Sequence, residues 1–504
     1  MATDPFKKMQ KVWPIFRWAN WWLSDDLFTG IKNSFYYSND MEIREDAKSI
    51  FPMWVPAYAD TNKRRACWDG STWTLRSEPV CVFYSKMDSG RIICWLRDIY
   101  KLTNGTTVTH LCTMPEDICD AEIFNGFIYV STLTHLYYKK DTWSYRSDMA
   151  SATDASANNY GRMVDTLTSN RNHPLYASDV CLVVWDVNKI RKVTKEIWKL
   201  LQDAIALQAN YVVRFINELW WFIRAVAVDE PYGSEVILWD KVSAQVNEVI
   251  PLEWYSIIWA TIYNWYHYLL SDKWLGLLNW YQYYLLKKSS WSIDNYQRNN
   301  MCVYDDKLYF VCNDWIYIYW AKNKNYADVL ALWHKKEDWY TLWAIWSSAY
   351  WILTTRGGRL NSDWTYEPIY VWINKWMATT WEIQTMCYFW TSMSEIKQSA
   401  YLRVGYHIPK EWNESWNIHI YYRTEADATT DNPSNWAWHE LTQPWWLNAQ
   451  WDMRSPFATT LKLNCRFQRI QFKFVLTNCV YDSGTKTKDT NLYSADLYYN
   501  TMLD

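Results

Sequence analysis

The sequence predicts an all-β protein, in which a β-propeller of about seven blades precedes a C-terminal β-sandwich or jelly-roll module. Three observations support this prediction. A unit of about 42 to 46 residues recurs along most of the chain, each unit holds two short apolar strands, and polar turn residues separate them. Such a period is typical of propellers, because each blade buries its faces only against its neighbours.

The repeated units follow one another at regular intervals. The first turns of five units lie near positions 125, 218, 264, 306 and 348, and the interval of about 93 between the first two is two periods. One further unit therefore belongs near position 172, and another fits one period before 125. The seven candidate units are residues 78–98, 124–141, 172–189, 217–241, 263–282, 305–322 and 347–375.

The pattern changes near residue 380. The strand-like segments become longer and their connections wider, as in the polar stretch TEADATTDNPSN at 424–435. Longer strands with wider connections are typical of a sandwich rather than of blades. We therefore expect three regions, which are an N-terminal arm at 1–40, a propeller at 41–385 and a separate β-sandwich at 386–504.

Two residue counts are abnormal. Glycine accounts for only 12 of the 504 residues, whereas tryptophan accounts for 39; the usual share of glycine is about 7%. Tryptophan also follows Asn or Asp where tight hairpins carry Asn-Gly or Asp-Gly. These pairs are Asn264-Trp265, Asn279-Trp280, Asp314-Trp315, Asp338-Trp339 and Asp363-Trp364, beside the glycine pairs Asp69-Gly70, Asn104-Gly105 and Asn125-Gly126.

Other tryptophans also stand where glycine is expected. A tight turn needs positive φ, which glycine adopts freely and a bulky aromatic residue does not. The doublets Trp21-Trp22, Trp220-Trp221 and Trp445-Trp446 resemble the doublet Gly357-Gly358, and three more tryptophans lie in polar, loop-like stretches: Trp274, Trp412 and Trp416.

We interpret both counts as a difference in decoding. A gene from a source that reads UGA as glycine, translated with a table that reads UGA as tryptophan, would show this deficit and this excess together. The interpretation predicts tryptophans at hairpin tips or exposed on loops, often with positive φ. The alternative is a tryptophan-rich binding surface, whose rings would cluster on one face.

Some tryptophans fit their positions as they stand. Trp185 in LVVWD and Trp239 in VILWD end apolar strands, where a large aromatic ring packs well. Trp436, Trp438 and Trp451 are also plausible as tryptophan. Glycine at 198 would instead weaken the helical pattern of residues 195–219, and we expect strands there.

Charge and cysteine content exclude several classes of protein. The formal net charge is −3, which gives no electrostatic argument for binding nucleic acid or an anionic membrane. The first residues contain no apolar core of signal-peptide length, and no apolar run is long enough for a membrane span, since the nearest, 254–274, is broken by Asn264, His267 and Asp272. The eleven cysteines form no C-x-x-C pair, so we expect free, mostly buried thiols in a reducing compartment and no zinc site.

The search for catalytic chemistry yields little. The eight histidines are scattered, and His267 in a strand-like run is expected to be a satisfied core or surface residue. Asp272, Asp306 and Asp314 are candidates for the paired carboxylates of a propeller glycosidase, but turns favour Asp for backbone reasons. Runs of tyrosine could stack on sugars, although cross-strand packing explains them more simply. We expect no catalytic, cofactor or metal site and therefore no enzyme.

With glycine at most tryptophan positions, residues 21–36 become GGLSDDLFTGIKNSFY. This opening, the repeated units and C-terminal stretches such as RVGYHIP and FQRIQFKFVLTN resemble the propeller-containing virion proteins of tailed bacteriophages. The resemblance implies a structural tail or baseplate protein that is made in the bacterial cytoplasm and located in the virion. Its partners would be other virion proteins, further copies of itself, and a glycan or receptor on the host surface.

The resemblance transfers no catalytic residue to this chain. The alternative hypothesis is a carbohydrate-binding or glycoside-cleaving propeller protein that acts at a cell surface. A carboxylate pair at glycosidase spacing would favour that alternative.

Overall fold

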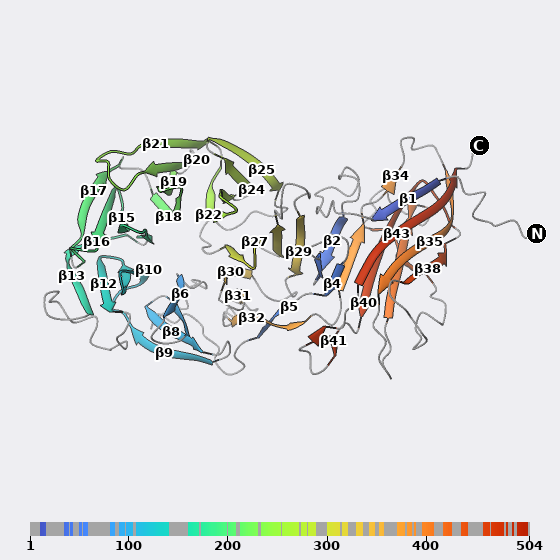
Figure 1. The fold of residues 1–504 in the computed structure, drawn as a ribbon, viewed down its shortest axis with the longest axis horizontal. Helices are drawn as coiled ribbons and strands as arrows, with labels where there is room; N and C mark the ends of the chain where they lie inside the picture. The colour runs from blue at the N-terminus through green and yellow to red at the C-terminus, as the bar shows by residue number, and fades with distance from the viewer. Residues whose placement is uncertain are drawn as a thin grey trace, which may run out of the picture. The chain divides into compact units, whose positions relative to one another are not determined.

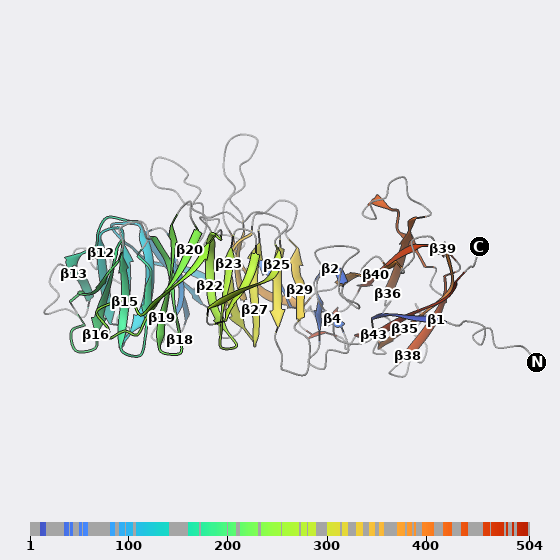
Figure 2. The same cartoon turned by 90° about the horizontal axis from the view of Figure 1, so that it is seen from above.

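In the computed structural model, the secondary-structure elements of the described residues are all strands, which confirms the all-β prediction. Figures 1 and 2 show them as arrows. The structure describes residues 11–16, 35–39, 41–43, 50–52, 54–58, 81–85, 90–95, 97–103, 107–140, 160–170, 173–198, 200–207, 212–229, 233–253, 255–271, 274–279, 281–288, 300–312, 315–320, 329–335, 342–347, 352–356, 370–377, 381–385, 388–389, 396–407, 417–425, 435–441, 457–463, 465–477, 480–481, 486–487 and 491–501.

The chain divides into two compact units. Unit 1 comprises Met1–Pro56, Trp315–Lys335 and Asn374–Asp504. Unit 2 comprises Ala57–Asp314 and Lys336–Ile373.

Seven of the described sheets have four antiparallel strands. Five of them lie within unit 2, and each uses four consecutive strands. They are β6 (Cys81–Ser85), β7 (Gly90–Trp95), β8 (Asp98–Thr103) and β9 (Thr107–Thr113); β10 (Ile118–Phe124), β11 (Phe127–Thr132), β12 (His135–Lys140) and β13 (Tyr160–Thr166); β14 (Leu175–Ala177), β15 (Cys181–Asp186), β16 (Lys189–Thr194) and β17 (Gln202–Ala206); β18 (Val212–Leu219), β19 (Phe222–Asp229), β20 (Gly233–Trp239) and β21 (Glu248–Glu253); and β22 (Ile257–Tyr263), β23 (Tyr266–Ser271), β24 (Trp274–Asn279) and β25 (Gln282–Lys288).

The two remaining four-stranded sheets differ in how they are assembled. The sixth again uses consecutive strands, which are β26 (Met301–Tyr304), β27 (Lys307–Cys312), β28 (Trp315–Trp320) and β29 (Val329–Lys335). The seventh combines β30 (Leu342–Ser347), β31 (Ile352–Arg356) and β32 (Tyr370–Met377) with β5 (Trp54–Tyr58) from near the N-terminus. An N-terminal strand therefore completes the last sheet of the series.

Successive four-stranded sheets lie side by side. The first strand of each sheet contacts the first strand of the next, from β6 to β10 and onward through β14, β18, β22 and β26 to β30. Figure 1 shows this progression as the colour runs from blue through green to yellow. Strands β17 and β18 fall within 195–219, as expected from the sequence.

The hydrophobic core lies between adjacent sheets. Ile92 and Ile99 of the first sheet pack with Ile128 and Val130 of the second, and similar clusters fill the next three interfaces. The six residues of β15 are all buried, because both of its faces are covered. Each of the first five sheets therefore depends on its neighbours for burial, as the repeat pattern predicts.

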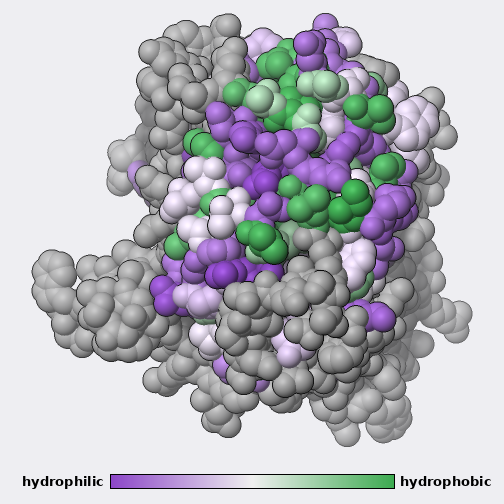
Figure 3. Space-filling view, turned by 90° about the vertical axis from the view of Figure 1, so that its left-hand side faces the viewer, coloured by the Kyte–Doolittle hydropathy of each residue, from purple (hydrophilic) through white to green (hydrophobic). Residues whose placement is uncertain are grey.

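The outward surface of the repeats is mixed in polarity. On the face seen in Figure 3, hydrophilic and hydrophobic groups interleave in small clusters across the residues that the structure describes. Single exposed apolar residues are ordinary on protein surfaces. This visible face therefore gives no reason to assign a broad apolar binding surface.

Unit 1 contains two larger antiparallel sheets. The seven-stranded sheet consists of β1 (Lys11–Phe16), β3 (Met41–Ile43), β4 (Ile50–Pro52), β35 (Lys397–His407), β38 (Phe457–Lys462), β39 (Arg466–Phe467) and β43 (Asn491–Thr501). The six-stranded sheet consists of β2 (Phe35–Asn39), β33 (Trp381–Thr385), β34 (Tyr388–Phe389), β36 (Asn417–Thr424), β37 (His439–Glu440) and β40 (Arg469–Thr477). A separate two-stranded ladder joins β41 (Val480–Tyr481) to β42 (Lys486–Thr487).

Candidate functional site

Two hairpin tips show the same backbone with different residues. Asn125 and Gly126 join β10 to β11 with φ values of 49° and 76°. Asn264 and Trp265 join β22 to β23 with φ values of 48° and 67°. Positive φ at both central residues is the geometry that favours Asn-Gly. Trp265 therefore occupies a glycine position, as the sequence predicts.

The tryptophan doublet behaves in the same way. Trp220 and Trp221 join β18 to β19 with φ values of 55° and 70°. Their residues are 44% and 78% exposed, and Trp265 is 75% exposed. Three large apolar rings thus stand in solvent on backbone that bulky residues rarely adopt. These three positions confirm the prediction of exposed tips with positive φ.

Other tryptophans assigned to turns have different outcomes. Trp315 is the first residue of β28 and pairs with Lys335, so its assignment to a turn is wrong. Trp274 opens β24, is half-buried and donates its backbone N–H to Ser271 Oγ, so its assignment to a loop is also wrong. Further positions lie outside the described residues: Trp21, Trp22, Trp280, Trp339, Trp364, Trp412, Trp416, Trp445 and Trp446.

The tryptophans expected to be genuine are core residues where they are described. Trp185 and Trp239 are 0% and 1% exposed, and both belong to the cluster between the third and fourth sheets. Trp185 Nε1 donates to the carbonyl oxygen of Val187 at 2.6 Å, and Trp239 Nε1 donates to that of Ser243 at 2.9 Å. Both indoles therefore have buried apolar surface and a satisfied N–H.

Trp436 is likewise buried, whereas Trp438 is half-buried. The guanidinium of Arg423 lies 4.3 Å from the centre of the Trp438 ring, which is within cation–π range. Trp198 also has an aromatic partner, because its ring stacks on Phe127 with centroids 4.4 Å apart. Trp451 lies outside the described residues.

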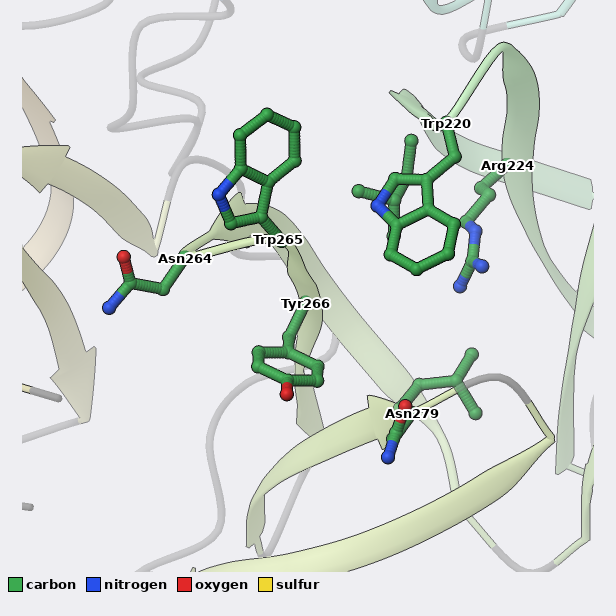
Figure 4. A pocket seen from close by; sticks show the side chains of 8 residues that line it. Trp220, Arg224, Asn264, Trp265, Tyr266 and Asn279 are labelled. Atoms are coloured by element: carbon green, nitrogen blue, oxygen red, sulfur yellow. The ribbon is translucent and has the colours of Figure 1, made fainter. Parts of the chain in front are cut away.

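A pocket of about 180 Å³ lies between the fourth and fifth sheets at the level of their hairpin tips. Figure 4 shows Trp265 and Tyr266 on one side of it and Trp220 with Arg224 on the other. The lining residues are Leu219, Trp220, Arg224, Asn264, Trp265, Tyr266, Leu278 and Asn279.

Arg224 is the charged residue of this lining. It lies on β19, is 5% exposed, and its Nε and Nη1 atoms have no hydrogen-bond partner within the described part of the chain. Burial lowers the pKa of Arg224, and the charge of Glu248 opposes that effect. A buried guanidinium with two open N–H groups is a donor site without an acceptor.

His267 lies on β23 and is 0% exposed. Burial, together with the charge of Arg224, lowers the pKa of His267 to about 3, so its imidazole is neutral at pH 7. Neither ring nitrogen has a hydrogen-bond partner among the described residues. The core position agrees with the sequence analysis, but the expectation that its polar atoms are satisfied is wrong.

The candidate carboxylates do not form a described pair. Asp306 lies with Asp305 at the tip between β26 and β27, where their φ values are 56° and 48°. A tip of this kind explains Asp306 as a turn residue. Asp272 and Asp314 lie outside the described residues.

The described part of the chain contains no metal-binding cluster, and its characterised cysteines are free thiols. It holds no cluster of three or more His, Cys, Asp or Glu side chains able to bind a metal ion. Six described cysteines are free thiols, and five of them are buried: Cys94, Cys112, Cys119, Cys181 and Cys302, with Cys465 half-buried. The described residues also contain no helix with the length and apolarity to cross a membrane.

Sequence analysis did not find Arg224 as a site residue. The signal available in the sequence was a single arginine in the apolar strand FIRAVAV, next to the Trp220-Trp221 doublet. A buried charge in such a strand requires a partner, but the sequence does not show whether one is present.

No family model and no curated protein matches the chain. Solved structures with limited similarity include the extracellular domain of the hybrid two-component system BT4673 from B. thetaiotaomicron, with 12% identity and a TM-score of 0.40 over 67% of this chain. This chain spans 42% of that domain's length. Virginiamycin B lyase from Staphylococcus aureus has 8% identity and a TM-score of 0.43, covering 62% of this chain and 98% of the lyase.

The WD40 domain of Neurospora crassa Pan2 has 9% identity and a TM-score of 0.38, covering 59% of this chain and 89% of that domain. Similarities of this extent identify no shared function.

Proposed function

We propose that this protein is a structural virion protein of a bacteriophage, of the tail or baseplate type. A rigid propeller of seven blades would serve as a scaffold for assembly or for attachment to the host surface. Its partners would be other virion proteins, and copies of the chain would assemble symmetrically. The role is mechanical and adhesive, and we propose no catalysis.

The observation that carries the scaffold is the series of seven four-stranded sheets. Their first strands contact one another in order, and hydrophobic clusters lie between neighbouring sheets from the first to the fifth. This is the packing expected of blades around a common axis. Strand β5 would close the ring by completing the seventh blade with an N-terminal strand.

A sandwich following the propeller is part of the same proposal. The two larger antiparallel sheets of unit 1 both carry buried apolar residues, such as Leu402 and Val404 on β35 and Phe472 and Phe474 on β40. Two such sheets are the components of a β-sandwich. In a virion, this module, to which the N-terminal strands β1 and β2 contribute, would bind neighbouring proteins.

The assignment to a bacteriophage rests on decoding and on the resemblance of residues 21–36. We propose that Trp220, Trp221 and Trp265 are glycine in the natural protein, because their backbone has the geometry that favours glycine. With glycine restored, the N-terminal opening and the repeats resemble virion proteins of tailed bacteriophages.

Mass spectrometry of purified bacteriophage particles tests both parts of this proposal. Peptides of this chain should be present in intact particles, and peptides covering 212–229 and 255–271 should carry glycine at 220, 221 and 265. Peptides absent from particles but present in infected cells would contradict the virion assignment. Tryptophan at these three positions, or UGG codons in the gene, would contradict the decoding assignment.

A further inference from the structure

Two donor atoms of Arg224, in the lining of the pocket, have no acceptor. Nε and Nη1 of Arg224 have no hydrogen-bond partner within the described residues, although the side chain is almost completely buried. His267 of β23, whose imidazole is close enough to feel the charge of Arg224, has two ring nitrogens without a partner among the described residues, although it does not line the pocket. Buried donors are normally satisfied, so such a group of open polar atoms indicates a missing partner.

Carboxylate chemistry fits this arrangement. A guanidinium presents its N–H groups as a planar fork, which matches the two oxygens of a carboxylate. Glu248 acts on the charge of Arg224, but it accepts no hydrogen bond from Nε or Nη1. The Tyr281 hydroxyl instead bonds to Glu248. Nε and Nη1 of Arg224 therefore have no acceptor among the described residues, and a carboxylate that enters the pocket would supply one.

The other residues of the pocket indicate that the ligand bearing this carboxylate is a sugar. Tyr266 is 41% exposed beside the pocket, and an aromatic face of this kind packs on the apolar face of a sugar ring. The amide of Asn279 is a donor and acceptor for hydroxyl groups. A volume of about 180 Å³ is smaller than the pockets of roughly 300–1,000 Å³ that hold drug-sized ligands, so one ring fits better than a peptide segment.

We propose that this pocket binds an acidic sugar, whose carboxylate accepts hydrogen bonds from Arg224 while its ring lies against Tyr266 and Asn279. The inference rests on the proposed function, because it gives host attachment a chemical class of receptor. The residues that carry it are Arg224, Tyr266 and Asn279, and the volume of the pocket and the burial of Arg224 are those of the chain with tryptophan at 220 and 265.

Titration calorimetry of the full chain with D-glucuronate tests the proposal. Binding should be at least about tenfold tighter than that of D-glucose, which lacks the carboxylate and so cannot accept the charged hydrogen bonds of Arg224. It should also be at least about tenfold tighter than that of acetate, which lacks the ring and its contacts with Tyr266 and Asn279. The substitution R224Q should weaken glucuronate binding by at least about tenfold. Its matched control is R97Q, which removes an arginine that is exposed and paired with Asp117, and should leave binding unchanged.

Further variants keep the proposal testable if R224Q does not fold. R224K keeps the charge and loses the planar fork, so it should also weaken binding. E248Q removes the neighbouring negative charge and should strengthen binding. Absence of glucuronate binding, equal binding of glucose, equal binding of acetate or tighter binding of an acidic dipeptide would overturn the proposal. None of these outcomes bears on the presence of the chain in virions, which particle proteomics tests separately.

Discussion

Tryptophan occupies two opposite environments in neighbouring sheets of this protein. Trp185 and Trp239 are buried between sheets and donate their indole N–H groups to backbone carbonyls. Trp221 and Trp265 are more than 70% exposed at hairpin tips with positive φ. The buried pair packs its rings in the core and satisfies its N–H groups. The exposed pair lies on backbone with positive φ, which favours glycine. Tryptophan is therefore a core residue at 185 and 239 but an exposed turn residue at 221 and 265.

The largest expected effect comes from the buried pair. Replacing Trp185 by glycine should lower the free energy of unfolding by about 3–5 kcal/mol, because it creates a cavity and removes a satisfied hydrogen bond. Urea unfolding followed by fluorescence or circular dichroism measures this loss. A change below about 1 kcal/mol would show that the interface between the third and fourth sheets does not depend on the indole.

The doublet should respond in the opposite direction. W220G/W221G should raise the free energy of unfolding by about 1 kcal/mol for each residue, because glycine removes the strain of positive φ while adding some entropy to the unfolded chain. The same urea titration measures the gain. A loss of stability would contradict the assignment of these tips to glycine and would favour a structural role for the exposed rings.

The buried imidazole of His267 should make the free energy of unfolding depend on pH. Its pKa is about 3 in the folded chain and 6.5 in the unfolded chain, so the unfolded chain binds the extra proton between these values. Stability conferred by the neutral ring is therefore lost as pH falls below 6.5, by up to about 1.4 kcal/mol per pH unit. The difference in unfolding free energy between the parent and H267L should shift by this slope between pH 6.5 and 4.5. A difference independent of pH would contradict the buried, neutral assignment.

The smallest effect compares the two matched hairpins directly. Gly126 has a φ of 76°, and an added Cβ would meet no atom within 4 Å, so only backbone strain opposes a side chain there. G126A should therefore cost about 1 kcal/mol, whereas W265G should gain a similar amount. Thermal unfolding of the two variants in parallel checks the opposite signs. The same sign in both would show that the tips are not equivalent.

The repeated strands and hairpin tips were predictable because they depend on local patterns. Alternating apolar residues and Asn-Gly-like pairs determine a hairpin over a few residues, and the tip at Asn264-Trp265 follows from its likeness to Asn125-Gly126. The predictions that Trp315 lies in a turn and Trp274 in a loop were wrong, because both residues begin strands. A preceding Asp or Lys does not by itself distinguish the last turn residue from the first strand residue.

The pocket was not predictable, because it depends on contacts between different sheets. Arg224 and His267 are separated along the chain and belong to neighbouring sheets. Whether either side chain has a hydrogen-bond partner depends on how those sheets pack, and this cannot be predicted from the spacing of residues along the chain. The sequence shows that a charge lies in an apolar strand, but only the packed structure shows that its N–H groups remain open.

Strand β5 has a consequence for the order of events during synthesis. It emerges from the ribosome long before β32, the strand that it joins in the seventh sheet. Until Tyr370–Met377 has been made, residues Trp54–Tyr58 have no hydrogen-bonding edge to occupy. The nascent chain must therefore keep this segment unpaired while the strands between β5 and β32 are made, and the seventh sheet is completed only by a contact between residues more than 300 positions apart.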